Sequence, residues 1–175
     1  MQSDETRAFP AALAAALADE FPYLDGEGMD LEAFDAFLSA AETTDWLRSW
    51  TGNEELTGDL FRVFAQDGTG GYAALWLVRE GRELAEQPVV FLGSEGETAV
   101  VARDLPDFLW LLAAGLGPAE LTLGLRDPED VRPDAPRTAV AEQHAPDRRR
   151  PAAEILADAA REFPGFPETV EEWCR

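Results

Sequence analysis

The chain has 175 residues, enough for one hydrophobic core and too few for two comfortable domains, so we expect a single domain over residues 1–175. Hydrophobic residues make up 46% of the sequence, which excludes a disordered composition. Acidic residues number 35 against 14 arginines and no lysine, and this net charge of −21 argues against nucleic acid and anionic membranes as partners, because phosphate binding needs a surplus of cations.

The acidity has two interpretations, and the sequence leaves both open. It serves solubility or follows a composition rich in alanine, glycine and arginine, or else it attracts a basic partner and speeds association with it. Cys174 is the only cysteine, so no internal disulfide can form, and residues 1–5 are acidic where an export signal would be basic. No apolar run reaches the roughly 20 residues of a membrane span, and a cytoplasmic protein is therefore expected.

The N-terminal part is predicted to hold two helices separated by a turn. Residues 25–28 form the turn, and Asp30 is then expected to cap a second helix over residues 31–41, with Glu32 and Asp35 in its first turns. The first helix should end before Pro22, because the residue before a proline leaves the helical region. Its apolar stripe recurs at every fourth position: Phe9, Leu13, Leu17 and Phe21.

Two tryptophans, Trp46 and Trp50, lie one helical turn apart within residues 43–53. An exposed pair would form a recognition patch for a partner. Indole side chains bury a large apolar area, however, so a place in the core is the better interpretation.

The segment from Leu60 to Leu112 is predicted to organise the fold. Apolar side chains on both faces of residues 72–78 indicate a central strand that is covered on both sides. The predicted fold class is α+β, with a central, mainly antiparallel sheet of at least four strands flanked by N-terminal, middle and C-terminal helices. The segment contains four β-rich runs and then an apolar helix capped by Asp104: residues 60–65, 72–78, 88–92, 99–102 and 105–112.

A glycine-rich turn joins the first two strands and contains Gly68, Gly70 and Gly71. It opens no helix, so it lacks the helix N-terminus that would bind a phosphate. A tight hairpin that needs positive φ explains these glycines, and we assign them a structural role in the turn.

The region at about residues 126–147 contains four prolines, many acids and no apolar period, which predicts a Pro-rich acidic surface loop or a partly mobile linker. The three arginines at 148–150 follow it, and we expect them to pair with nearby acids or to cap the preceding loop. A last amphipathic helix is expected over residues 155–163, followed by a short tail in which Trp173 can dock on the body.

Few residues are candidates for chemistry. His144 falls in the predicted loop without a rigid mount or an orienting partner, and Cys174 has no neighbouring base. The absence of lysine excludes Schiff-base enzymes and Walker-type loops. Asp25, Glu27 and Asp30 alternate with glycines as in some calcium loops, but their spacing does not match an EF-hand. We therefore predict no catalytic residues, no metal site and no cofactor.

One pattern of strands, glycine turns and a closing helix runs through the middle third of the chain. Two strands joined by a glycine turn lie within residues 64–76, a strand and a second glycine turn within 88–97, a strand at 100–102, and the helix at 105–112. This pattern resembles the core of the SUKH superfamily, which includes bacterial immunity proteins and relatives of fungal cell-wall-assembly regulators. The resemblance implies an α+β fold and a protein that binds and neutralises a toxin, commonly a nuclease, without catalysis of its own. The family pattern has no catalytic residues to transfer to this chain.

The leading hypothesis is an intracellular binding protein that covers a basic toxin domain with an acidic surface, since nucleases carry basic clefts for phosphate. A second hypothesis is a regulatory or scaffold module that binds a host-cell protein through its tryptophan and loop surface. The third is a carboxylate-dependent hydrolase, which needs two facing acids in a pocket, one with its pKa raised by burial. The oligomeric state stays open. The predicted partner interface consists of eight acids: Asp25, Glu27, Asp30, Glu54, Glu55, Glu129, Asp130 and Asp134.

Overall fold

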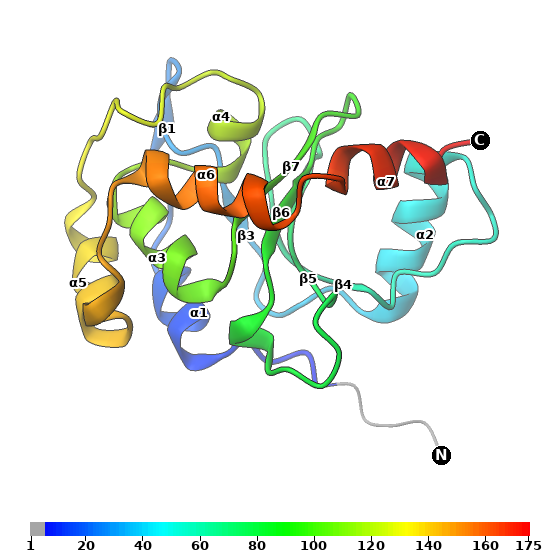
Figure 1. The fold of residues 1–175 in the computed structure, drawn as a ribbon, viewed down its shortest axis with the longest axis horizontal. Helices are drawn as coiled ribbons and strands as arrows, with labels where there is room; N and C mark the ends of the chain where they lie inside the picture. Colours follow the sequence, from blue (N-terminus) through cyan, green and yellow to red (C-terminus); the bar gives the residue numbers. More distant parts are fainter. Residues whose placement is uncertain (1–5) are drawn as a thin grey trace.

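Four consecutive β-rich segments pair with their neighbours, and a short fifth strand precedes them, in a computed structural model that describes residues 6–175 (Figure 1). The resulting sheet has the order β3-β4-β5-β6-β7, every pair is antiparallel, and helices flank it, which confirms the predicted α+β class. In chain order the elements are α1 (Ala11–Ala16), β1 (Tyr23–Leu24), β2 (Glu27–Gly28), β3 (Glu32–Ala33), α2 (Ala40–Thr51), β4 (Phe61–Gln66), β5 (Tyr72–Trp76), the 3-10 turn η1 (Leu84–Glu86), β6 (Val89–Leu92), β7 (Thr98–Ala102), α3 (Leu105–Ala113), α4 (Pro118–Thr122), α5 (Ala135–His144), η2 (Pro146–Arg148), α6 (Ala152–Glu162) and α7 (Phe166–Trp173).

Strand β5 lies at the centre of the sheet and is covered on both faces, as its two apolar faces predict. Ala73 and Leu75 point into a first core, which the sheet shares with α1, α3 and α5. Ala74 points into a second core on the opposite face, which is closed by α2, α7 and the end of α6. Figure 1 shows the two helical layers on either side of the sheet. The alternation of side chains along one strand therefore builds two separate cores.

The segment over residues 31–41 is not the predicted helix. Its first part forms β3, and the backbone N–H groups of Phe34 and Leu38 then donate to the carbonyls of Phe64 and Val63 in β4, at 2.9 and 3.0 Å. Because β4 provides hydrogen-bond partners for this extended backbone, the segment stays extended although its apolar residues have helical spacing. The helix begins only at Ala40, because Ser39 and Glu42 form a capping box.

The region 126–147 is only partly a loop, because α5 occupies its second half. Asp134 caps this helix by accepting a hydrogen bond from the Arg137 backbone N–H at 3.0 Å. Pro136 lies in the first turn, where a helix needs no backbone donor, so the proline supports the helix start and does not break the helix. His144, predicted in a loop, lies exposed in the last turn of α5.

Helix α1 is shorter than predicted and ends at Ala16, although Leu17 and Phe21 are buried as their spacing requires. The buried guanidinium of Arg137 donates to the main-chain carbonyls of Ala16, Asp19 and Glu20 and stacks on the Phe21 ring at 3.8 Å. These contacts hold residues 17–21 in a non-helical course. A side chain distant in sequence thus decides where the helix stops.

The C-terminal segment is a helix, α7, where a short tail was predicted. Trp173 packs edge-on against Phe61 with ring centroids 6.0 Å apart, so it docks on the body as expected. The Arg175 backbone N–H donates to the Thr51 carbonyl at 3.0 Å, and the Asn53 amide donates to the Trp173 carbonyl at 2.9 Å. These contacts fix α7 against the end of α2.

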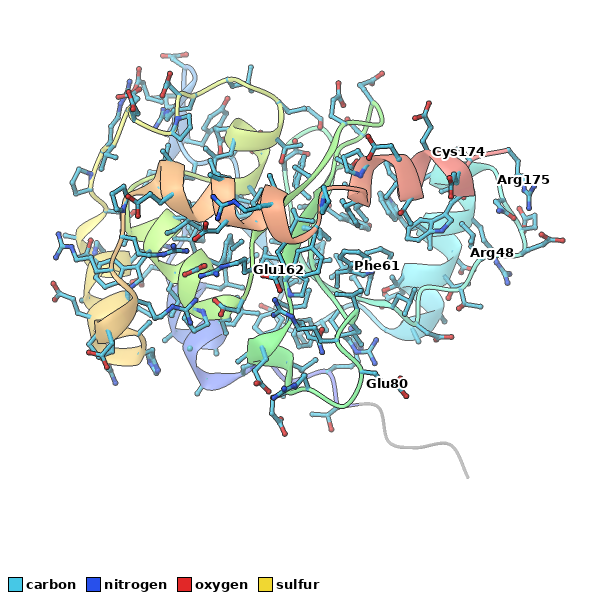
Figure 2. All side chains as sticks on the ribbon, in the orientation of Figure 1. Arg48, Phe61, Glu80, Glu162, Cys174 and Arg175 are labelled. Atoms are coloured by element: carbon cyan, nitrogen blue, oxygen red, sulfur yellow. The ribbon has the colours of Figure 1, made fainter. Side chains whose placement is uncertain are left out.

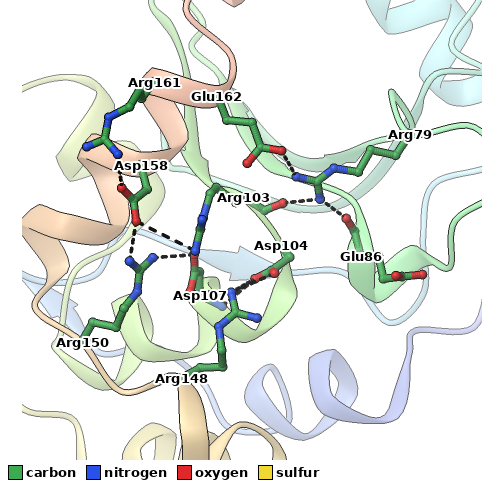
Figure 3. A network of polar contacts seen from close by, with 10 residues as sticks. All are labelled: Arg79, Glu86, Arg103, Asp104, Asp107, Arg148, Arg150, Asp158, Arg161 and Glu162. Carbon is green, nitrogen blue, oxygen red and sulfur yellow. Dashed lines mark hydrogen bonds and ion pairs between the residues drawn. The ribbon is translucent and has the colours of Figure 1, made fainter.

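A buried ionic cluster joins α3 to the chain that leads into α6 (Figure 3). Asp107 is fully buried and accepts hydrogen bonds from Arg103, Arg148 and Arg150 at 3.2, 2.8 and 2.9 Å. Arg149 lies 3.8 Å from Glu142, so all three arginines of the 148–150 run pair with acids, as predicted. The three arginines therefore attach the segment before α6 to α3 and α5.

Within residues 6–175, no helix combines the length and the apolar character that crossing a bilayer requires. The acidic residues 1–5, on which the expectation of no export signal depends, lie outside the described part of the chain.

Candidate functional site

The strongest candidate site is an acidic groove along the free edge of the sheet. Strand β3 pairs with β4 on one side only, and a groove of about 550 Å³ lies on its other side, between residues 17–23 and 30–35. We call it the β3 groove. Its lining includes Phe21, Leu31 and Tyr23, and it includes five carboxylates: Asp19, Glu20, Asp30, Glu32 and Asp35.

No arginine of the described residues 6–175 forms an ion pair with these five carboxylates. Within residues 6–175, every arginine except Arg48 and Arg62 lies within ion-pairing distance of an acid, and those two donate to backbone carbonyls. None of the five groove carboxylates is among the paired acids of this described range. The cations are thus committed elsewhere, and the groove has a negative potential that a cationic ligand can relieve.

The walls of the groove are held rigidly. Arg137 fixes the wall that contains Asp19 and Glu20 through their carbonyls. On the other wall, the Asp30 backbone N–H donates to Glu120 Oε1 at 2.6 Å, and Asp30 Oδ1 accepts from the Gly68 backbone N–H at 3.0 Å. A rigid site loses little conformational entropy when it binds a ligand.

The hairpin of β1 and β2 adds apolar surface beside the groove. Tyr23 and Leu24 are 45% and 75% exposed, so they lie outside the core with apolar surface open to solvent. The hairpin reverses at Asp25 and Gly26, whose φ angles of 52° and 79° lie in the left-handed region. The groove and the hairpin together place negative charge beside an exposed aromatic ring, and aromatic side chains are enriched at protein–protein contacts.

The eight predicted interface acids divide into separate groups. Glu27 and Asp130 both pair with Arg132, which brings the β1–β2 hairpin together with the loop that carries Glu129. Asp25 lies at the tip of that hairpin, and Asp30 lines the β3 groove. These five acids are Asp25, Glu27, Asp30, Glu129 and Asp130.

The other three predicted acids lie elsewhere or have structural roles. Glu54 and Glu55 follow α2 at the opposite end of the molecule from the β1–β2 hairpin (Figure 1), and Glu55 pairs with Arg175 at 3.2 Å. Asp134 caps α5 and pairs with Arg137 at 3.5 Å. The predicted acids therefore do not form one continuous surface.

Sequence reasoning missed four of the groove carboxylates: Asp19, Glu20, Glu32 and Asp35. Glu32 and Asp35 were assigned to the first turns of a helix that does not exist. Asp19 and Glu20 reach the groove because α1 ends early, which depends on Arg137. No local signal in the sequence marks these residues, since a tertiary contact brings the two walls together.

The turn that joins β4 to β5 lies beside the groove and contains the three predicted turn glycines. Gly70 has a φ of 92°, which a side chain rarely adopts. Gly71 needs space, since a Cβ there would lie 2.8 Å from Phe91 Cζ, and a Cβ on Gly68 would lie 3.2 Å from the Asp30 carboxylate. Positive φ therefore explains Gly70, whereas close packing explains the other two.

Glu120 is a buried carboxyl group that accepts a hydrogen bond from the Asp30 backbone. Burial raises the pKa of Glu120, and Asp30 contributes a repulsive charge beside it, yet Glu120 Oε2 is enclosed and unpartnered and does not line the groove. Residues 6–175 contain no group of three or more metal-binding side chains arranged to hold an ion.

Comparisons of this chain with protein-family models, with curated proteins and with solved structures gave no match. The resemblance to the SUKH superfamily stays a prediction from the sequence pattern.

Proposed function

We propose that this chain is an intracellular binding protein of the immunity type, which neutralises a basic toxin domain, commonly a nuclease, by protein–protein contact. The set of uncompensated carboxylates in the β3 groove supports this proposal most directly. An acidic groove beside an exposed aromatic ring is complementary in charge to a basic protein surface.

The mechanism of neutralisation is competition for the same surface. A nuclease binds its substrate through a cleft of arginine and lysine side chains, which release counterions when they meet phosphate. The groove carboxylates take the place of those phosphates and cover the cleft. The net charge of −21 also steers the two proteins together before contact.

Calorimetric titration against a basic nuclease domain tests the proposal. The groove variant replaces Asp19 and Asp35 by Asn and Glu20 and Glu32 by Gln, and it leaves Asp30 in place because Asp30 holds the Gly68 turn. We expect the variant to bind about thirtyfold more weakly, since each exposed ion pair contributes on the order of 0.5 kcal/mol. Affinity should also fall as salt rises.

The matched control removes the same amount of charge from acids outside the groove: Glu80, Glu154, Glu168 and Glu172, each replaced by Gln. We expect the control to bind within about threefold of the unmodified protein, because long-range charge contributes less than a contact. Equal weakening in both variants would show that net charge alone drives binding. Binding that is insensitive to salt and to the groove variant would contradict the proposal.

A further inference from the structure

A second groove lies across the β4–β5 turn from the β3 groove. It has a volume of about 580 Å³ and runs between the turn that joins β6 to β7 and helix α7, with α2 at its end. We call it the α7 groove. Its lining includes an indole, three carboxylates, an apolar contact and the only cysteine of the chain: Trp50, Glu95, Glu97, Glu171, Val170 and Cys174.

The turn at residues 67–71 links the two grooves. The Gly68 backbone N–H bonds to Asp30 of the β3 groove at 3.0 Å, and the Ser94 hydroxyl of the α7 groove donates to Thr69 Oγ1 at 2.9 Å. One turn of chain thus contacts a lining residue of each groove. A partner that covers this end of the sheet can reach both.

Trp50 contributes the apolar surface of its ring to the α7 groove, because its indole N–H already donates a hydrogen bond within the protein. The indole N–H donates to the Gly93 carbonyl at 3.0 Å, and the ring stacks on Trp46 with centroids 5.1 Å apart. Both tryptophans are half-buried, so the pair belongs partly to the core and partly to the surface. An indole surface beside carboxylates is an environment that binds a cationic side chain, through the ring quadrupole and through ion pairs.

The three carboxylates of this groove have no cation of their own. Across residues 6–175, no arginine lies within ion-pairing distance of Glu95, Glu97 or Glu171, and no arginine lines the groove. Arg175, at the end of α7, pairs instead with Glu55. Figure 2 shows Cys174 and Arg175 at this end of the helix.

The walls of this groove are also fixed. Phe166 and Val170 hold α7 to the second core, and the Gly93 backbone N–H donates to the Glu97 carbonyl at 2.7 Å across the β6–β7 turn. The site therefore exists before a ligand arrives, which lowers the entropic cost of binding.

We propose that the α7 groove accepts a cationic side chain, arginine or lysine, from the same basic partner that occupies the β3 groove. The proposal rests on the proposed function for the identity of the partner as a basic protein. The charge of −21 disfavours a second copy of this chain as the occupant, and the acidic composition of residues 1–5 disfavours that segment in the same way.

Nuclear magnetic resonance on the full-length chain tests the groove without the partner. The probe is the tripeptide acetyl-Gly-Arg-Gly-amide, and its control carries citrulline, which keeps the shape and loses the charge. We expect shifts of the Trp50 indole N–H and of amides at residues 94–98 and 167–174 with the arginine peptide only. Equal shifts with citrulline, or shifts spread evenly over the acidic surface, would overturn the proposal.

Two changes to the groove, each with its own control, sharpen this test. Changing Glu97 and Glu171 to Gln should weaken the arginine peptide about fivefold, since exposed ion pairs are individually weak, whereas the same change at Glu80 and Glu154 should leave it unaltered. Modification of Cys174 with N-ethylmaleimide should obstruct the groove and abolish the shifts, while Cys174→Ser should bind normally. Unchanged binding in the groove variant, or unchanged binding after modification, counts against the site.

The same groove variant separates this inference from the proposed function. Against a basic partner domain, the Glu97→Gln, Glu171→Gln variant should bind about fivefold to tenfold more weakly than the charge-matched control. Full affinity in this variant, together with loss in the β3 groove variant, would refute the α7 groove and leave the proposed function standing. Absence of salt-sensitive binding to any basic domain would refute the proposed function itself.

Discussion

Glu120 is a carboxyl group with a higher cost of ionisation than an exposed acid. It is buried, its Oε2 has no partner, and burial raises its pKa above the ordinary value of 4.5, while the hydrogen bond from the Asp30 backbone N–H and the charge of Arg126 offset only part of this effect. Its Oε1 accepts the backbone N–H of Asp30 and so positions one wall of the β3 groove. Because the fold disfavours the charged form, the cost is absent at low pH, grows once pH passes the ordinary value of 4.5 and is complete above the raised pKa.

The variant Glu120→Gln should therefore be more stable than the unmodified protein at pH 7 to 8, by about 1 kcal/mol. The amide oxygen still accepts from Asp30 and no charge is buried, but the amide N–H₂ takes the enclosed place of Oε2, which limits the gain. The difference in free energy of unfolding between the two proteins should shrink as pH falls toward 4.5 and vanish below it, where Glu120 is protonated in both the folded and the unfolded chain. Urea unfolding at several pH values measures it, with the exposed Glu129→Gln as control. A difference that does not vary with pH would contradict this account.

Gly71 illustrates a glycine required by packing. A Cβ at this position would lie 2.8 Å from Phe91 Cζ and 3.1 Å from the Leu92 carbonyl oxygen, so Gly71→Ala should lower the free energy of unfolding by about 1–3 kcal/mol. Gly165→Ala is the control, since a Cβ there meets no atom within 4 Å and φ is negative. Chemical denaturation compares the two. Similar stability for both variants would show that the turn relaxes at little cost.

At the scale of elements, the cluster around Asp107 joins α3 to the chain entering α6. Replacing Asp107 by Asn removes the charge that three arginines share, and it should cost about 3 kcal/mol, because breaking a buried ion pair leaves its partners uncompensated. Hydrogen exchange in α6 should accelerate as its attachment weakens. The control Glu142→Gln removes an exposed pair and should cost less than about 0.5 kcal/mol. If Asp107→Asn is as stable as the control, water molecules satisfy the hydrogen-bond donors of the three arginines as well as Asp107 does.

Elements encoded locally were predicted well, and elements that depend on tertiary contacts were not. The strands and α3 follow from period-two apolar runs and from a cap at Asp104, whose side chain accepts from the Asp107 backbone N–H at 3.0 Å. The segment 31–41 has helical spacing, yet backbone partners in β4 hold it extended. The same limit applies to the candidate site: Asp30 was anticipated, but its neighbours across the groove depend on where Arg137 ends α1.

At the scale of the whole molecule, the net charge of −21 acts against the compact state. Most arginines already have close acidic partners, so the charge left over is repulsive and long in range. Salt screens it, and the melting temperature should rise by several degrees between about 20 mM and about 500 mM sodium chloride. Circular dichroism melts at the two concentrations test this, with sucrose-matched samples as control. A fall in melting temperature would show that local ion pairs outweigh the repulsion.

The position of the 67–71 turn between two grooves has a kinetic consequence for any partner that occupies both. When one contact opens, the other keeps the partner tethered at a high effective concentration, and the open contact re-forms before the partner diffuses away. The residence time then grows far beyond that of either contact alone. Durable capture at this end of the sheet can thus arise from two individually weak and readily formed attachments.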